Sequence, residues 1–125
     1  MDKMLIFLLV TAAWCLVAAA FGFFLSRKGR PHNLAVKIIH GLLSLPIIGG
    51  VISCIYQLQS ISNSKAFLSI SLYLLGLATC IKIVSGIIIA VTKMERPGAV
   101  LLHRIGTYLI VVSLLASLVF VLAKI

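Results

Sequence analysis

The sequence predicts an all-α integral membrane protein, folded as a four-transmembrane-helix up-down-up-down antiparallel bundle. Hydrophobic residues make up 62% of the 125 residues and charged residues only 10%. Soluble domains carry about 45–50% apolar and about 25% charged residues. Four separate runs reach the roughly 20 apolar residues that a helix needs to cross a bilayer. The segments between these runs are short, which favours antiparallel neighbours.

The first apolar run, Met4–Leu25, contains the small-residue segment Val17-Ala18-Ala19-Ala20, which is typical of signal-peptide cleavage sites. Its apolar core is much longer than the roughly 7–15 residues of a signal sequence, so we expect a retained helix. The other spans are expected at Leu34–Gln57, Ala66–Val91 and Ala99–Ala123. The chain has room for a single four-helix transmembrane domain, residues 1–125, and for no soluble domain.

The basic residues cluster where the apolar runs end. The first connecting segment holds Arg27, Lys28 and Arg30, and the third holds Lys93 and Arg96. The positive-inside rule therefore places these two segments in the cytoplasm and both termini outside. The net charge of +9 is thus a signal of topology, and no nucleic-acid partner is expected. We expect a bacterial inner (plasma) membrane protein whose first partner is the lipid bilayer.

Two histidines lie at nearly the same depth in two predicted spans. At a rise of about 1.5 Å per residue, His40 is about 9 Å into the second span and His103 about 6 Å into the fourth. These two spans run parallel and occupy a diagonal of the simplest bundle, so both imidazoles face its interior near the cytoplasmic end. Ionisable residues inside a membrane are costly and mark functional sites.

Two imidazoles at one level can hold the iron of a b-type haem between facing helices. The haem propionates would need cations, and Lys37, Arg96, Arg104 and also Arg30 lie at that end. Small residues follow each histidine, namely Gly41, Ser44, Gly106 and Ser113. They make room for a macrocycle or, equally, for close helix packing.

For each histidine the alternative is a hydrogen bond to a neighbouring helix, a loop or a lipid headgroup. Other metals and proton handling also stay open for the pair. Zinc is disfavoured because no Cys, Asp or Glu lies nearby as a third ligand. His32, beside Pro31 in the basic segment, is interpreted as interfacial.

Lys82 is the other unusual residue, because it lies well inside the third span. A lysine at a helix centre costs about 2.5–3.5 kcal/mol on insertion scales. Its small or polar helical neighbours predict a side chain that points into the bundle or toward a partner, with an acceptor in reach. We interpret Lys82 as a counter-charge for a bound anion, a propionate or an acidic residue of another subunit. The alternative is a lysine that extends to the cytoplasmic interface.

The two halves of the chain are weakly alike. In each, a helix containing a glycine (Gly22, then Gly86) ends in a basic segment with Arg-Pro and is followed by a helix with an early histidine. A two-helix parallel repeat would explain this likeness, and so would chance.

The segment Leu102-His103-Arg104-Ile105-Gly106-Thr107-Tyr108 resembles helix openings of b-type membrane cytochromes and ferric-reductase-like proteins. The segment Lys37-Ile38-Ile39-His40-Gly41 is similar to the companion helix of such folds. Diheme cytochromes of this kind use four histidines from four helices, but the first and third spans here contain none. The resemblance therefore implies at most one bis-histidine haem b.

The first hypothesis is a small b-type cytochrome or haem-bearing subunit, an electron-transfer or accessory subunit more than a stand-alone enzyme. Its cofactor-binding residues would be His40, His103, Lys37, Arg96, Arg104 and Lys82. The alternative is a non-catalytic accessory or assembly subunit of a larger membrane complex. The third is a small-molecule channel or transporter that uses Lys82. A membrane-protein partner or a homo-oligomer is expected.

Overall fold

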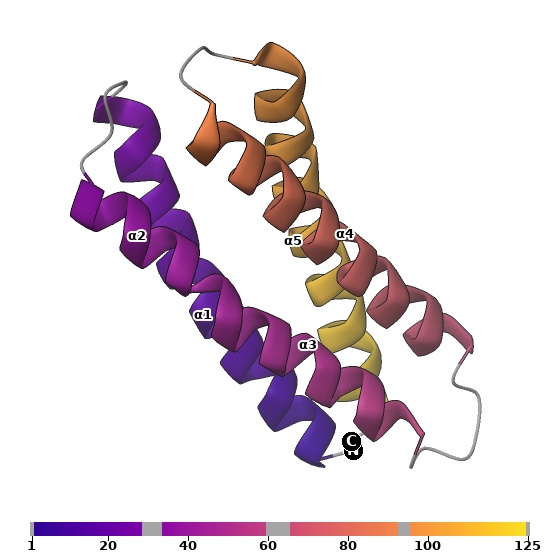
Figure 1. The fold of residues 1–125 in the computed structure, drawn as a ribbon. Coiled ribbons are helices and arrows are strands. Elements are labelled where there is room, and N and C mark those ends of the chain that lie inside the picture. Colours follow the sequence, from indigo (N-terminus) through magenta and orange to yellow (C-terminus); the bar gives the residue numbers. More distant parts are fainter. Residues whose placement is uncertain (1, 29–33, 60–65, 93–95, 125) are drawn as a thin grey trace.

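The computed structural model describes residues 2–28, 34–59, 66–92 and 96–124. These residues form the helices α1 (Asp2–Lys28), α2 (Leu34–Leu42), α3 (Ser44–Leu58), α4 (Ala66–Val91) and α5 (Pro97–Lys124) (Figure 1). Within these ranges there is no strand, and four stretches are long and apolar enough to cross a membrane: α1, α2 with α3, α4, and α5. The prediction of an all-α chain with four such stretches is confirmed.

The second predicted span is interrupted. A turn at Leu43 separates α2 from α3. Pro46, the third residue of α3, has no amide hydrogen, and in a continuous helix its ring would crowd the Leu42 carbonyl. The Ser44 hydroxyl donates to the Gly41 carbonyl at 2.6 Å and satisfies an acceptor beside the break. The predicted span Leu34–Gln57 is confirmed as one apolar stretch, Leu34–Leu58, with a local turn at Leu43 that the sequence analysis did not predict.

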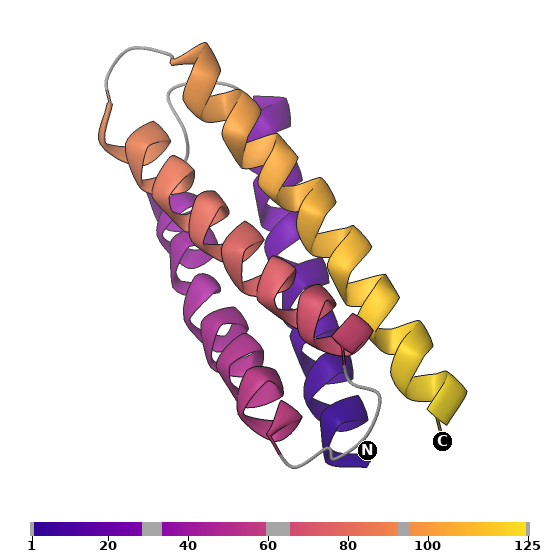
Figure 2. The same cartoon turned by 90° about the vertical axis from the view of Figure 1, so that its right-hand side faces the viewer.

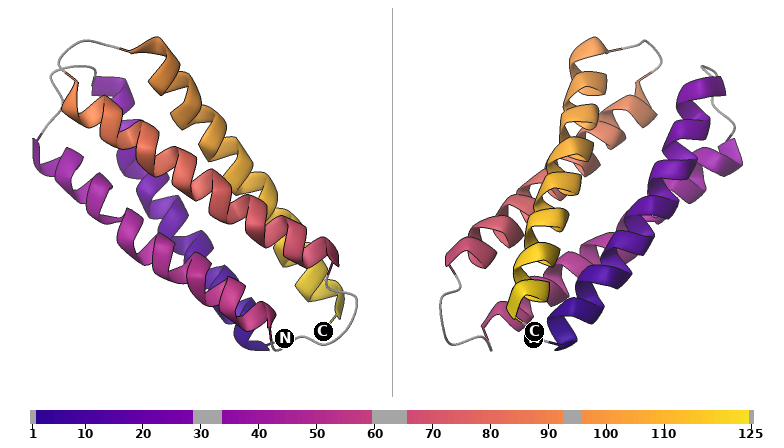
Figure 3. Two further views of the ribbon diagram at one scale, coloured as in Figure 1. Left: turned by 45° about the vertical axis from the view of Figure 1, so that its right-hand side comes forward. Right: turned by 180° about the vertical axis from the view of Figure 1, so that it is seen from behind.

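The helices form two pairs. The helix α1 packs against α2 and α3, and α4 packs against α5 (Figures 1 and 2). The pairs meet where α3 contacts α4 and where α1 contacts α5, so the α2–α3 stretch lies diagonally opposite α5. Figure 3 shows the two termini at one end of the bundle. The other end, called the histidine end below, holds the last turns of α1 and α4 and the first turns of α2 and α5.

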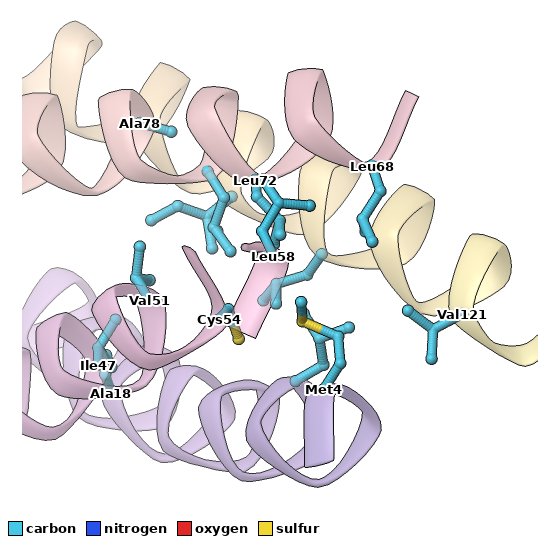
Figure 4. Close-up of a cluster of buried hydrophobic side chains, with 14 residues drawn as sticks. Met4, Ala18, Ile47, Val51, Cys54, Leu58, Leu68, Leu72, Ala78 and Val121 are labelled. Atoms are coloured by element: carbon cyan, nitrogen blue, oxygen red, sulfur yellow. The ribbon is translucent and has the colours of Figure 1, made fainter. Parts of the chain in front are cut away.

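The large buried apolar side chains gather toward the end that carries the termini (Figure 4). Those with almost no exposed surface are Met4, Leu8, Cys54, Leu68, Leu72, Leu75 and Val121. Many other large apolar side chains lie on the outside; Leu16 is 73% and Val91 is 74% exposed. Such an exterior is typical of helices that face lipid. The apolar core thus lies mainly toward the end that carries the termini, where small polar side chains such as Thr11, Ser71 and Ser117 are also buried.

The close approach of α1 and α3 depends on Gly50. A Cβ atom there would overlap Thr11 Oγ1 and lie 3.1 Å from Thr11 Cβ. Thr11 has no exposed surface, and its hydroxyl donates to the Phe7 carbonyl of its own helix at 2.6 Å. A side chain at position 50 would therefore force the two helices apart.

Candidate functional site

The structure brings His40 of α2 and His103 of α5 together at the histidine end. Their ring centroids are 6.3 Å apart, and the ring planes make an angle of 65°. Both side chains are half-buried. Because α2 and α5 occupy opposite corners, the two imidazoles meet across the interior, which is the juxtaposition that the sequence predicts.

Each imidazole packs against a glycine of the helix that precedes it in the chain. A Cβ atom on Gly22 of α1 would lie 2.9 Å from Cε1 of His40. A Cβ atom on Gly86 of α4 would lie 3.1 Å from Cε1 of His103. Ordinary carbon–carbon contacts are about 3.5–4.0 Å, so a larger residue at either position would displace the ring. In both halves of the chain, the imidazole therefore packs against a glycine of the preceding helix.

The orientation of His103 is set by hydrogen bonds to α4. Its Nδ1 lies 3.0 Å from the carbonyl oxygen of Lys82 and 3.2 Å from Ser85 Oγ. Since a carbonyl oxygen only accepts, Nδ1 carries the hydrogen and donates it. In the neutral imidazole, Nε2 then keeps a free lone pair. A backbone carbonyl that holds one ring nitrogen is the usual support of a metal-binding histidine.

His40 has an unsatisfied ring nitrogen. Its Nδ1 is buried and has no hydrogen-bond partner among the described residues. The Ala18 carbonyl of α1 is the backbone group that approaches the ring. A buried polar atom without a partner costs about 1–3 kcal/mol, and each one calls for an explanation such as an unseen ligand or water. This nitrogen is enclosed by the protein, with the Ala18 carbonyl of α1 as the polar group near the ring.

Lys82 of α4 reaches across to α5 inside the bundle. Its Nζ donates to Thr107 Oγ1 and lies 3.5 Å from the carbonyl oxygen of His103. The close packing of the two helices here depends on Gly106, where a Cβ atom would lie 3.1 Å from Cβ of Lys82. The side chain points inward to an acceptor, as expected, and does not extend to the interface. Thr107, which the sequence analysis missed, is the acceptor.

The cations that were predicted to meet haem propionates lie at the histidine end, but they differ in exposure and in hydrogen bonding. Lys37 Nζ donates to the Ala90 carbonyl in the last turn of α4 at 2.8 Å, so this ammonium ties α2 to α4. Arg96 and Arg104 are exposed near the start of α5. Arg30 and His32 lie outside the described residues.

The small residues that follow the histidines do not line the space between the rings. Around Gly41 a Cβ atom would meet nothing within 4 Å, and Gly106 accommodates Lys82. The Ser44 hydroxyl donates to the Gly41 carbonyl, and that of Ser113 donates to the Leu109 carbonyl of its own helix. Close packing, the second of the two interpretations, describes Gly106. The glycines that touch the histidines are Gly22 and Gly86 of the neighbouring helices.

Two surface grooves of about 290 and 270 Å³ lie along the two helix pairs, and neither is lined by His40 or His103. Within the described ranges no three His, Cys, Asp or Glu side chains lie close enough together to hold a metal ion. A site of the structural-zinc type is therefore absent from that part of the chain.

Comparisons of the chain with protein families, with curated proteins and with solved structures find no match. The arrangement of His40, His103 and Lys82 is thus what bears on function.

Proposed function

We propose that this chain is a small integral membrane b-type cytochrome, or a haem-bearing subunit of a larger membrane complex, that binds one haem b between His40 and His103. When bound, such a haem supplies reversible one-electron transfer. The observation that carries the proposal is the 6.3 Å separation of the two ring centroids across the bundle diagonal.

This separation suits two imidazoles on opposite sides of one metal ion. Metal–imidazole bonds of about 2.0–2.1 Å in a linear arrangement place the ring centroids roughly 6 Å apart. A direct hydrogen bond between the rings, with the nitrogen atoms about 2.9 Å apart, would place the centroids roughly 5 Å apart. The rings at 6.3 Å are too far apart for such a bond; they make an edge-to-face contact, and this centroid spacing is compatible with a metal ion held between two imidazoles.

The two imidazoles differ in the hydrogen bonds of their ring nitrogens. The Lys82 carbonyl accepts from Nδ1 of His103 and leaves Nε2 as the ligand nitrogen. His40 has a buried nitrogen that nothing in the described chain satisfies. Gly22 and Gly86 let the two rings sit back against α1 and α4, because any Cβ there would press on them.

The polar exterior of the histidine end supplies the remaining partners. Arg104 follows His103 directly and is exposed there together with Arg96, so both can meet propionates. With the basic segments in the cytoplasm, the histidine end faces the cytoplasm and both termini lie outside. One haem at this depth cannot carry an electron across the whole bilayer, so the chain exchanges electrons with a membrane-protein partner or a second copy.

The test is an absorption spectrum of the purified protein, oxidised and then reduced with dithionite. The wild type is expected to show a low-spin bis-histidine spectrum. His40→Ala and His103→Ala should each abolish or convert it, because each removes one axial ligand. The control, His32→Ala, changes the third histidine of the chain and should leave the spectrum intact.

A wild-type protein that purifies colourless from haem-replete cells would overturn the proposal. The paired imidazoles would then be helix-packing groups, and the chain a non-catalytic accessory subunit.

A further inference from the structure

The groove of about 270 Å³ between α1 and α2 lies on the outside of the bundle, at the histidine end. It is lined by Ala20, Phe21 and Phe24 of α1 and by Val36 of α2, so all its walls are apolar. Water in such a groove finds no hydrogen-bond partner. In a bilayer the groove therefore takes hydrocarbon, such as an acyl chain of a lipid.

Arg27 lies at the end of this groove. It follows Phe24 by three residues and Ala20 by seven, so the three side chains share one face of α1. The guanidinium carbon of Arg27 is 5.7 Å from the centre of the Phe23 ring. A guanidinium that lies over an aromatic ring keeps the N–H groups at its edge for other partners. A cation is thus placed where an acyl chain in the groove would meet its headgroup.

The charge of Arg27 is not balanced by a carboxylate within the described part of the chain. The sequence contains only two acidic residues against eleven Lys and Arg. Asp2 begins α1 at the opposite end of the helix, and Glu95 lies outside the described residues. The partner that complements Arg27 is therefore an anion from outside the chain. Guanidinium groups bind phosphate oxygens through two parallel hydrogen bonds.

We propose that Arg27 and the α1–α2 groove bind one anionic phospholipid, with its phosphate at Arg27 and an acyl chain along the groove. Basic pockets between transmembrane helices bind anionic headgroups in this way. A zwitterionic lipid suits the site less, because the segment after Arg27 adds Lys28 and Arg30 and no acidic residue for an ammonium headgroup. The inference does not depend on haem.

The groove between α4 and α5 provides a contrast within the same molecule. It is also almost entirely apolar, and on α4 it extends to Ile88. The same face of α4 continues to Val91 and Thr92, three and four residues further on, and so meets no cation before the helix ends. We therefore place no headgroup there.

Trp14, the single tryptophan of the chain, can report on a lipid in the α1–α2 groove. It precedes Phe21 by seven residues on the same face of α1 and is 39% exposed. At about 1.5 Å per residue it lies about 20 Å along the helix from Arg27. This places Trp14 near the end of an acyl chain whose phosphate is at Arg27.

The experiment measures quenching of Trp14 fluorescence in phosphatidylcholine vesicles that contain phosphatidylglycerol brominated near the end of an acyl chain. The reference is brominated phosphatidylcholine at the same mole fraction. In the wild type, the brominated phosphatidylglycerol should quench as if it were about fivefold more abundant, the usual effect of one cation beside an anionic lipid. In Arg27→Gln the two lipids should quench alike. Ala20→Ile keeps the charge but fills the groove, and it should also lose the selectivity.

Two controls remove a positive charge elsewhere. Arg104→Gln removes it from an exposed position at the same end of the bundle. Lys124→Gln removes an ammonium that lies 5.7 Å from the centre of the Phe120 ring, a similar contact at the other end. Both variants should keep the selective quenching. Circular dichroism of every variant checks that its helices form.

Equal quenching by the two lipids in the wild type would overturn the inference. So would selectivity that survives in folded Arg27→Gln or Ala20→Ile, or that is lost equally in Arg27→Gln and Arg104→Gln, which would indicate general surface charge. Addition of inorganic phosphate, compared with chloride of equal ionic strength, should leave the selectivity unchanged. Its loss in phosphate alone would assign Arg27 to free phosphate and overturn the lipid site.

Discussion

Replacing Gly22 by alanine tests whether the packing of the His40 ring against Gly22 matters for haem binding. The added Cβ would lie 2.9 Å from His40 Cε1, 3.5 Å from Nε2 and 3.6 Å from Nδ1. Restoring an ordinary carbon–carbon contact of about 3.5 Å requires the ring to move by roughly 0.6 Å. This exceeds the tolerance of about 0.5 Å within which a binding constellation keeps its geometry.

The expected result for Gly22→Ala is haem affinity lowered about 10–100-fold, the usual effect of disturbing groups that orient metal ligands. Helix propensity acts in the opposite direction, because alanine in a helix interior is more stable than glycine by about 0.5–1 kcal/mol. A selective loss of haem from a protein that still folds would therefore point to the histidine. The assay is the rate of haem transfer to an excess of a haem-scavenging protein.

Alanine substitutions at two further glycines should give smaller losses of haem affinity. At Gly86 the corresponding contact, to His103 Cε1, is 3.1 Å, so that ring needs to yield less and the loss should be smaller. Gly41 follows His40 directly, but a Cβ there would meet nothing within 4 Å, so Gly41→Ala should hold haem like the wild type. Equal haem retention in Gly22→Ala and Gly41→Ala would refute the idea that the contact between Gly22 and His40 controls haem binding.

Two other predictions concern stability and topology. Gly50→Ala should lower the free energy of unfolding by about 1–3 kcal/mol, because overpacking against Thr11 separates α1 from α3. Thermal unfolding in detergent measures this change. The control is Gly49→Ala, because a Cβ atom at position 49 would meet nothing within 4 Å. Equal melting of the two variants would contradict it. Reporter fusions after Gln59 and at the C-terminus should both report the outer side, because the basic segments are retained in the cytoplasm; a cytoplasmic C-terminus would refute the assignment.

The helices follow directly from the sequence, because long apolar runs leave no other regular structure with satisfied backbone groups in a bilayer. The pairing of His40 with His103 also follows, since equal depth on diagonal helices is a matter of helical rise and short connections. The break at Leu43 was missed, although Pro46 signals it. An apolar run by itself does not show where a helix is locally distorted.

The finer features of the site depend on rotation of the helices about their axes, which apolar runs specify poorly. Most positions on every face of these membrane helices are apolar, so hydrophobic periodicity does not show that Gly22 and Gly86 face the histidines. For the same reason the sequence did not show that Thr107 accepts the hydrogen bond from Lys82. The position of Thr107, one helical turn after His103, could have indicated this contact. Lys37, which the sequence analysis assigned to a propionate, bonds the Ala90 carbonyl of α4.

The most direct test of the central claim is the ratio of haem b to polypeptide in wild-type protein purified from haem-replete cells. The account predicts one haem per chain, bound in a low-spin form with two imidazole ligands, because His40 and His103 together make one complete axial pair. A ratio near zero would contradict the claim. So would a stoichiometric haem that survives in the His40→Ala, His103→Ala double variant, because its ligands would then lie elsewhere in the chain.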